Sequence, residues 1–208
     1  MGRAFTDLAF TPRVRALQTK LGSRELYAPL DIASERRDAL TPREAAFIAT
    51  LDGFSQATVG ETGWPYVQFR GGPRGFLKVL DAKTLGYADF RGNVQYVSAG
   101  NLGGNERVAL LLIDHARRRR LKILGHGRLV TATEDAELVA RVTMPAYEAE
   151  VERAVIITVA AYDWNCPQHI TPRYTAEEVA ATIAPLEAEI GRLRADVARL
   201  RGETPTPR

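Results

Sequence analysis

The stretch GWPYVQFRGGPRGFLKVLD, residues Gly63 to Asp81, decides how the middle of the chain is interpreted. It holds two short runs of β-type residues, Pro65–Arg70 and Gly75–Leu80, and the Gly71-Gly72-Pro73 segment between them allows a sharp turn. Similar runs flank it, separated by turn residues: Phe54–Gly60, Leu85–Asp89, Arg107–Asp114 and Arg120–Thr131. Several short strands at this spacing predict an antiparallel barrel or sandwich.

Helices and one buried strand are predicted around these runs. Thr41, Pro42 and Glu44 have the spacing of a capping box that opens a helix, and Gly53 ends it. The apolar run AVIITVAA at Ala154–Ala161 predicts a strand that is buried on both faces.

Two further helices are predicted towards the end of the chain. Thr133 caps a short helix over Glu134–Arg141, and a second capping box at Thr175–Glu178 opens a helix that reaches about Arg201. Four segments follow from this pattern: a lead-in segment at 1–40, a barrel domain at 41–174, a C-terminal helix at 175–201 and a disordered tail at 202–208.

Composition limits the classes of function. The 208 residues suit one domain with an appendage, and the net charge of +3 is too small to indicate nucleic acid, although it suits a phosphorylated ligand. The single cysteine, Cys166, excludes an internal disulfide and suits a reducing compartment. Neither a signal-peptide core nor an apolar run of about 18 residues occurs, so we expect a cytoplasmic protein with no membrane partner.

Cations, amides and hydroxyls lie among aromatic residues between positions 69 and 98. The polar members are Arg70, Arg74, Lys78, Arg91, Asn93, Gln95 and Ser98, and the aromatic ones are Phe69, Phe76, Phe90 and Tyr96. Such a set suits a phosphorylated planar ligand, with arginine and lysine on the phosphate and flat side chains on the ring. The alternative is a solvated surface with core beneath it.

At these residues the sequence resembles the pyridoxamine 5′-phosphate oxidase-like proteins, the FMN-binding split-barrel group. The motifs that carry the resemblance lie between about residues 40 and 175: GFLKVLD, DFRGNVQY, NLGGNERVALLLID, RRRRLKILGHGRLV and DWNCPQHITPRY. The resemblance implies a mainly β fold with flanking helices (α+β), built on a six-stranded antiparallel split barrel. It also implies a homodimer with two FMN sites at its interface.

The resemblance assigns roles to individual residues. Lys78 would approach the FMN phosphate and ribityl chain, with Pro73 to Leu77 along the flavin and Arg70 or Arg74 in place of a family arginine. Arg120 would lie against the ring, with Lys122 facing the same site, and Trp164 would reach the partner's flavin. The full set of expected FMN-binding residues is Arg70, Arg74, Phe76, Leu77, Lys78, Asp89, Phe90, Arg91, Asn93, Ser98, Arg120, Lys122, Trp164, Asn165, Gln168 and His169.

Within that set, Arg91 and Ser98 are the expected phosphate anchors. The segment from Trp164 to His169 is expected to form a loop over the partner's flavin, in which Cys166 is a small packed residue. A metal site or a cysteine nucleophile is not predicted there, because Cys166 and His169 lack the spacings of known zinc motifs and an orienting group.

The expected function is that of an FMN-dependent oxidoreductase acting on an unknown small molecule, with no residue assigned as acid or base. Vitamin B6 oxidation is the rival activity. The oxidases hold the substrate phosphate with an Arg-x-His arrangement soon after the tryptophan, whereas here His169 precedes Arg173 and two prolines intervene. A different class is a non-catalytic protein that holds flavin, or haem through His126 or His169.

Two features owe nothing to the resemblance. Arg117 to Arg119 are predicted to form a solvated hairpin tip. Residues 179–201 carry apolar side chains at alternating spacings of four and three, which predicts either a parallel two-stranded coil or a helix lying on its own barrel. Pro185 is expected to kink or restart this helix.

Overall fold

The structure is a computed structural model that describes residues 1–202. The predicted disordered tail, apart from its first residue, Gly202, therefore lies outside the described residues. Two compact units make up the chain. The first holds residues 1–114 and 119–168, and the second holds the turn His115–Arg118 and the chain from His169 on.

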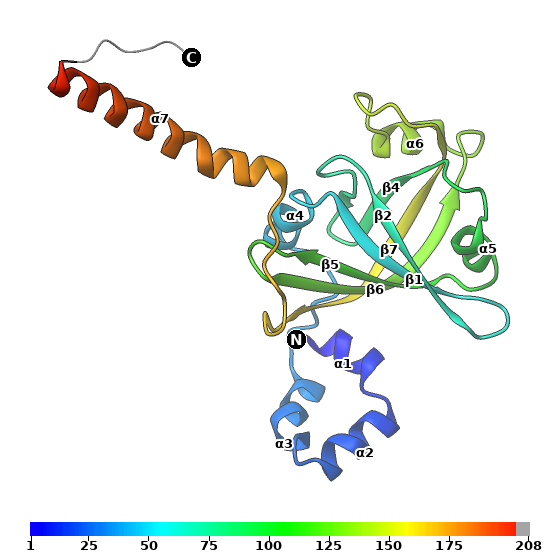
Figure 1. Ribbon diagram of the computed structural model, residues 1–208. Coiled ribbons are helices and arrows are strands. Elements are labelled where there is room, and N and C mark those ends of the chain that lie inside the picture. The colour runs from blue at the N-terminus through cyan, green and yellow to red at the C-terminus, as the bar shows by residue number, and fades with distance from the viewer. Residues whose placement is uncertain (203–208) are drawn as a thin grey trace. The chain divides into compact units, whose positions relative to one another are not determined.

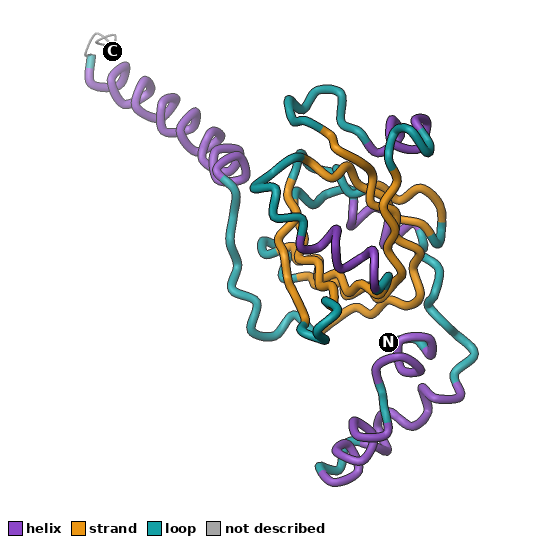
Figure 2. Tube along the Cα trace, turned by 90° about the vertical axis from the view of Figure 1, so that its right-hand side faces the viewer, coloured by secondary structure: helices purple, strands orange, loops and turns teal. Residues whose placement is uncertain are grey.

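Seven antiparallel strands form a single sheet in the order β2-β1-β5-β6-β7-β4-β3. Figures 1 and 2 show these strands curling around a common interior. The mainly β fold with flanking helices is confirmed, but the sheet has seven strands rather than six. Their bounds are β1 Gly53–Val59, β2 Pro65–Gly71, β3 Lys78–Asp81, β4 Thr84–Phe90, β5 Arg107–Asp114, β6 Arg119–Val130 and β7 Val151–Asn165.

Strand β7 is longer than the predicted apolar run. Its central residues are buried on both faces, apart from the exposed Thr158 and the half-buried Ala160, because β6 and β4 pair with it on its two edges and the core packs against it. The strand extends through Trp164 and Asn165, so the expectation that these two residues belong to a loop is wrong. Their backbone is instead fixed by pairing with β6.

Strand β3 is shorter than predicted. It begins only at Lys78, since Phe76 and Leu77 turn into the core, where they are 2% and 3% exposed. Phe76 stacks on Phe54, with ring centroids 5.7 Å apart, and both rings contact Tyr87 edge-on. This aromatic cluster lies in the core at the start of β1.

The helices of the first unit are partly as expected. Helix α4 (Pro42–Ile48) begins with the predicted capping box. Helix α6 (Ala136–Val142) is capped by Asp135 rather than by Thr133, and α5 (Val97–Gly104) was not predicted. The lead-in segment is mostly helical, with α1 (Arg3–Ala9), α2 (Pro12–Lys20), α3 (Arg24–Tyr27) and the 3-10 helix η1 (Ala28–Ile32).

The second unit is dominated by α7 (Ala176–Arg201), which runs for 26 residues from the Thr175 capping box to a left-handed Gly202. Pro185 lies inside this helix and does not end it, so the expected restart at that residue is wrong. In the turn between β5 and β6, Arg118 has a left-handed backbone (φ 51°), which confirms the hairpin tip, although Arg119 already belongs to β6. Between residues 1 and 202, no helix is long and apolar enough to cross a bilayer.

Candidate functional site

A polar pocket of about 210 Å³ lies where β2, the end of β4 and the start of α5 meet. The inward-facing residues of β2, Tyr66, Gln68 and Arg70, line one side of it. Its remaining lining residues are Asp89, Phe90, Gly92, Asn93, Val94, Gln95, Tyr96, Val97, Ser98, Ala99 and Glu152. Five of the expected FMN-binding residues, Arg70, Asp89, Phe90, Asn93 and Ser98, are therefore brought together.

Asp89 is the buried charge of this pocket, at 6% exposure. Its Oδ1 accepts a hydrogen bond of 2.8 Å from Arg70, and its Oδ2 lies 3.4 Å from Nε of Arg153 on β7. Burial raises the pKa of the Asp89 carboxyl, and the two guanidinium groups oppose that rise. Nε of Arg70 is buried and has no hydrogen-bond partner within residues 1–202, so a donor remains for a further acceptor.

The loop before α5 is strained. Val94 and Tyr96 have left-handed backbones, with φ of 52° and 53°. Such a conformation is rare for a β-branched residue and costs about 1–3 kcal/mol, and strain of this kind clusters at functional sites. The loop is held by its neighbours: Arg91 makes two hydrogen bonds to the Glu150 carboxylate (2.9 and 3.1 Å), and the Tyr96 hydroxyl donates to Glu152 (2.8 Å).

The first turn of α5 faces the pocket. The first backbone N–H groups of a helix have no intrahelical partner, and the N-cap residue here, Tyr96, gives them no side-chain acceptor either. The buried Ser98 donates its hydroxyl proton to Gln68 at 2.9 Å. Unpaired N–H groups at the positive end of a helix dipole suit an anion such as a phosphate.

Several expected FMN-binding residues lie away from this pocket. Phe76 and Leu77 are buried in the core, Arg74 is exposed, and Lys78 is half-buried at the start of β3. Arg91 is adjacent to the pocket but pairs with Glu150 on the surface.

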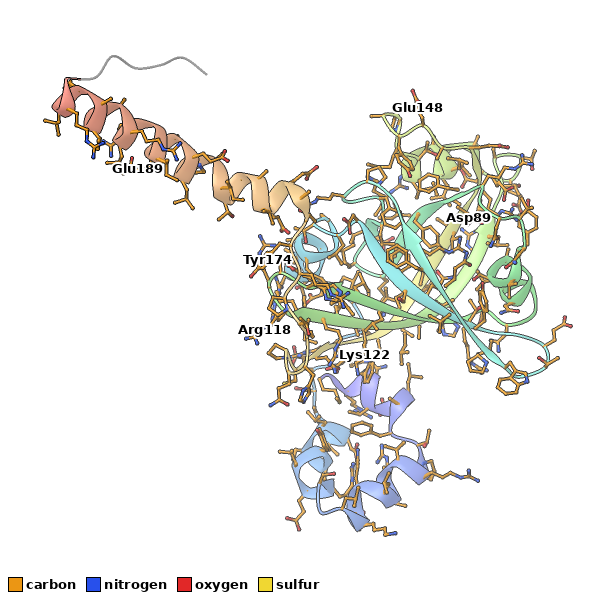
Figure 3. The ribbon with its side chains drawn as sticks, in the orientation of Figure 1. Asp89, Arg118, Lys122, Glu148, Tyr174 and Glu189 are labelled. Carbon is orange, nitrogen blue, oxygen red and sulfur yellow. The ribbon has the colours of Figure 1, made fainter. Side chains whose placement is uncertain are left out.

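A second group of expected residues lies at the far end of β7, where Arg120 pairs with Asn165 in the ladder and Lys122 with Asp163. Figure 3 shows Lys122 and Asp89 on different sides of the barrel. Arg153 beside the pocket and Asn165 are twelve residues apart on one strand, which corresponds to about 40 Å at ~3.3 Å per residue. One chain therefore does not bring the two groups together.

Trp164 lies at the same end of β7, on the face of the sheet opposite to Asn165, and its own chain holds it. Its indole Nε1 donates to Oε1 of Glu44 at 2.6 Å, and its ring lies edge-on to Phe47 at 4.8 Å. The guanidinium groups of Arg43 and Arg119 lie 4.9 and 4.8 Å from the indole centroid. Glu44 is 2% exposed and also caps α4 through Thr41.

The remaining expected residues divide between the two units. Cys166 is exposed, so its expected packed position is wrong: the chain leaves the sheet after Asn165 and the thiol has no core to enter. Gln168 is also exposed, and His169, which belongs to the second unit, has a left-handed backbone (φ 63°). No group of three or more potential metal-ligating side chains occurs within residues 1–202.

Sequence reasoning missed Gln68, Arg153 and Glu152 at the pocket and Glu44 beside Trp164. The alternation of β2 could have indicated Gln68, because it shares the inward face with Arg70. Glu44 was interpreted only as a helix cap. Nothing local marks Arg153, whose partner Asp89 is brought to it by the β4–β7 pairing.

The outer face of the sheet carries an apolar surface. Cross-strand register aligns two rows of outward-facing residues, and among them Val67 and Phe69 are 62% and 69% exposed. An apolar hollow of about 260 Å³ lies on this face. The rows are Phe69, Ser55, Leu111 and Lys122, and Val67, Ala57, Ala109 and Leu124.

Comparison with known proteins places this fold. Residues 36–170 match the family model described as pyridoxamine 5′-phosphate oxidase. No curated protein matches. Among solved structures, HupZ of Group A Streptococcus is 20% identical, with 65% of this chain and 99% of that chain covered and a TM-score of 0.45.

Two further solved structures are similar to a comparable degree. A Clostridium acetobutylicum protein related to general stress protein 26 is 12% identical, covering 66% of this chain and 94% of its own (TM-score 0.44). An F420 reductase is 19% identical, covering 57% and 94% (TM-score 0.40). The family match spans well over half of the chain, and the chain therefore belongs to the pyridoxamine 5′-phosphate oxidase-like family, whose members typically bind flavins and are generally dimeric.

Proposed function

We propose that this protein is an FMN-dependent oxidoreductase whose pocket beside α5 receives the FMN phosphate. The observation that carries the proposal is the unpaired first turn of α5, which faces a pocket containing the half-buried Arg70. A phosphate carries close to two negative charges, and backbone N–H groups together with a guanidinium are the donors that hold it best.

The residues present fit that phosphate. Nε of Arg70 is a buried donor without a partner within residues 1–202, and Ser98 and Asn93 add a hydroxyl and an amide at the pocket wall. Arg91 lies next to the pocket and can exchange its exposed pair with Glu150 for a ligand oxygen. The contacts of Arg91 and Tyr96 with Glu150 and Glu152 hold the loop in its strained conformation around this position.

The pocket of one chain is too small for the whole cofactor. Its volume of about 210 Å³ lies below the ~300–1,000 Å³ of typical small-molecule sites. In the proposal, one chain holds the phosphate end and a second copy completes the site at the ring. The group at the far end of β7, with Arg120, Trp164 and Asn165, would then serve the partner's flavin.

The apolar face of the sheet supports a homodimer of this kind. Val67 and Phe69 expose apolar side chains next to a hollow that is apolar throughout most of its lining. Contiguous exposed apolar surface is a mark of a protein interface. A second copy covering this face would remove both side chains from water.

The flavin, when bound, supplies the electron transfer, and the residues of the chain bind and orient it. Arg70, Ser98 and the α5 amides would fix the phosphate. Arg120 and Lys122 would place positive charge near the ring. No side chain is assigned as an acid or base, and the substrate is a small molecule of unknown structure.

Binding of FMN and riboflavin to purified protein tests the proposal. Arg91 lies beside the pocket, and Lys78 lies outside the pocket of one chain but is assigned to the phosphate by the family resemblance. We expect Arg91→Ala and Lys78→Ala each to weaken FMN binding by roughly 1.5–3 kcal/mol, the value of a charge-assisted hydrogen bond, which is about tenfold or more in Kd. Riboflavin lacks the phosphate, so the variants should bind it as the parent does. Arg13→Ala, at an exposed arginine on α2, is the matched control.

The absorbance spectrum of the protein as purified complements these titrations. Twin flavin bands support the proposal, whereas a haem band or unchanged FMN affinity in both variants contradicts it. If only Arg91→Ala loses affinity, Lys78 does not bind the phosphate, and the proposed phosphate position beside α5 still stands.

A further inference from the structure

Helix α7 presents a narrow apolar seam to solvent. Its seven seam residues are between 43% and 83% exposed, and their spacing along the helix alternates strictly between four and three. The seam residues are Val179, Ile183, Leu186, Ile190, Leu193, Val197 and Leu200. A repeat of seven residues keeps apolar side chains on one line only if the helix winds around a partner, since a straight helix drifts by about 20° per heptad.

The identity of the seam residues indicates the kind of partner. Ile183, Ile190 and Val197 occupy the a positions and are β-branched, whereas the d positions from Leu186 on are leucine. This combination favours two parallel strands. On the opposite side of the helix lie small residues such as Ala188 and Ala195, so the apolar surface is confined to the seam.

The charges beside the seam are complementary to a second copy in parallel orientation. Glu189 and Asp196 occupy g positions, and Arg194 and Arg201 occupy e positions, where neither arginine makes an ion pair within residues 1–202. A parallel pair places Glu189 opposite Arg194 of the second copy and Asp196 opposite its Arg201. An antiparallel pair would place acid against acid.

A hollow on α7 has the lining that a parallel partner requires. It measures about 290 Å³ and is bordered by Ile190, Leu193, Arg194 and Val197, with Ala198 beside them. These four residues occupy the a, d, e and following a positions, which together receive a d-position side chain in a parallel coil. Leu193 of the second copy would fill the hollow.

We propose that α7 pairs in parallel and in register with α7 of a second copy of this chain. Pro185 lies at a c position, facing away from the seam, so its ring does not obstruct the contact and costs one helical hydrogen bond. About three heptads form only a marginal coil by themselves. The pairing therefore adds to a dimer that another surface also holds together.

Cysteine cross-linking tests the orientation and register. In a Cys166→Ser background, Leu193→Cys places one thiol at the same level of both helices, and we expect a disulfide-linked dimer after mild oxidation. Ala195→Cys, two residues along and on the opposite side of the helix, is the matched control and should remain largely uncross-linked. Equal cross-linking at both positions, or none at position 193 in a protein that is dimeric by sedimentation, overturns the proposal.

Charge reversal tests the contribution of the flanking pairs. Arg194→Glu sets acid against acid in both symmetry-related contacts, and we expect the dimer dissociation constant from sedimentation to rise roughly threefold to tenfold. Arg192→Glu, which removes the i,i+3 partner of Glu189 on the same helix, is the control and should have the smaller effect. An Arg194→Glu dimer as tight as the parent contradicts the pairing.

These outcomes do not depend on the proposed FMN site. Deleting residues 186–208 should leave a dimer with a larger dissociation constant and an unchanged flavin content. A truncated dimer as tight as the full chain would contradict the helix pairing and leave the FMN proposal standing. A weaker truncated dimer, together with unchanged FMN affinity in Arg91→Ala and Lys78→Ala, would do the reverse.

Discussion

Two clusters, one near each end of β7, are built from the same kinds of residue but differ in how their polar groups are paired. At one end, Asp89 lies between Arg70 and Arg153 with Tyr96 nearby. At the other, Glu44 bonds to Trp164, with Arg43 and Arg119 against the indole. Each cluster combines a buried carboxylate, two arginines and an aromatic ring.

The two carboxylates differ in how they are satisfied. Both oxygens of Glu44 accept hydrogen bonds from its own chain, two at Thr41 and one at Trp164. Beside Asp89, by contrast, Nε of Arg70 and Nε of Arg153 have no hydrogen-bond partner within residues 1–202, and the neighbouring loop is strained. A cluster with unused donors next to a pocket can accept a ligand, whereas the Glu44 cluster fastens α4 to β7.

The largest expected effect is on the stability of the pocket cluster. Arg70→Ala removes the closer partner of Asp89 and leaves a buried carboxylate held only by Arg153. Removing one partner of a buried pair costs about 3–5 kcal/mol, and we expect the lower end, about 3 kcal/mol in the free energy of unfolding by urea. Adding Asp89→Asn to this variant should restore most of that loss, since no uncompensated charge remains. A double variant as unstable as Arg70→Ala would mean that packing rather than charge is responsible.

The next largest effect concerns the cluster around Glu44 and Trp164. Glu44→Ala removes the cap of α4 and leaves the Trp164 indole N–H without its acceptor, so we expect a loss of about 2 kcal/mol in unfolding free energy. Glu44→Gln keeps an acceptor oxygen and should cost less than Glu44→Ala. A Trp64→Phe background isolates the Trp164 fluorescence, which should shift to the red in Glu44→Ala as water reaches the ring. An unchanged spectrum would mean that Glu44 does not hold the Trp164 ring in its partly buried position.

The elements that could be predicted from the sequence are those whose signals lie within a few consecutive residues. The capping boxes at Thr41 and Thr175 depend on four consecutive residues, and both occur in the structure. Helix α5 was missed because VSAGNLGG contains three glycines, which disfavour a helix in isolation. Pro185 was expected to interrupt α7, yet the helix continues through it.

The candidate pocket was partly predictable for the same reason. Arg70, Asp89, Asn93 and Ser98 are close in sequence and do line one pocket. The contacts that distinguish the two clusters are long-range: Glu44 and Trp164 are 120 residues apart, and Tyr96 and Glu152 are 56 apart. The packing of α4 and of the loop before α5 against β7, which composition does not reveal, creates these contacts.

A smaller effect tests whether Trp164 also serves a ligand. If Trp164 covers the flavin of a second copy, Trp164→Ala should weaken FMN binding by roughly 1 kcal/mol, about fivefold, and restore part of the quenched flavin fluorescence. Trp64→Ala, at an exposed tryptophan, is the matched control and should leave both unchanged. Unchanged FMN affinity in Trp164→Ala would mean that Trp164 does not contact the flavin and only anchors α4 to β7.

The smallest expected effect is a difference in the pH dependence of stability between the two carboxylates. Burial opposes ionisation of both, but at Glu44 the hydrogen bonds from Thr41 and Trp164 outweigh it and lower the pKa, whereas at Asp89 burial outweighs the arginines and raises the pKa. Folded Glu44 therefore binds fewer protons than the unfolded chain below about pH 5, and its contribution is lost as pH falls. Folded Asp89 binds more, so its contribution is lost as pH rises above about pH 4.

The sign of the change in slope identifies each carboxylate. Between about pH 3 and 6, Glu44→Gln should make the rise of unfolding free energy with pH shallower, and Asp89→Asn should make it steeper. Urea unfolding at several pH values, with both variants compared with the parent, gives the two slopes. Other carboxylates with lowered pKa values, such as Asp81 and Glu152, affect all three proteins equally and cancel in the comparison. Slopes that change in the same direction in both variants would remove the distinction between a satisfied and an incompletely satisfied cluster, and with it the electrostatic reason for placing the ligand beside Asp89.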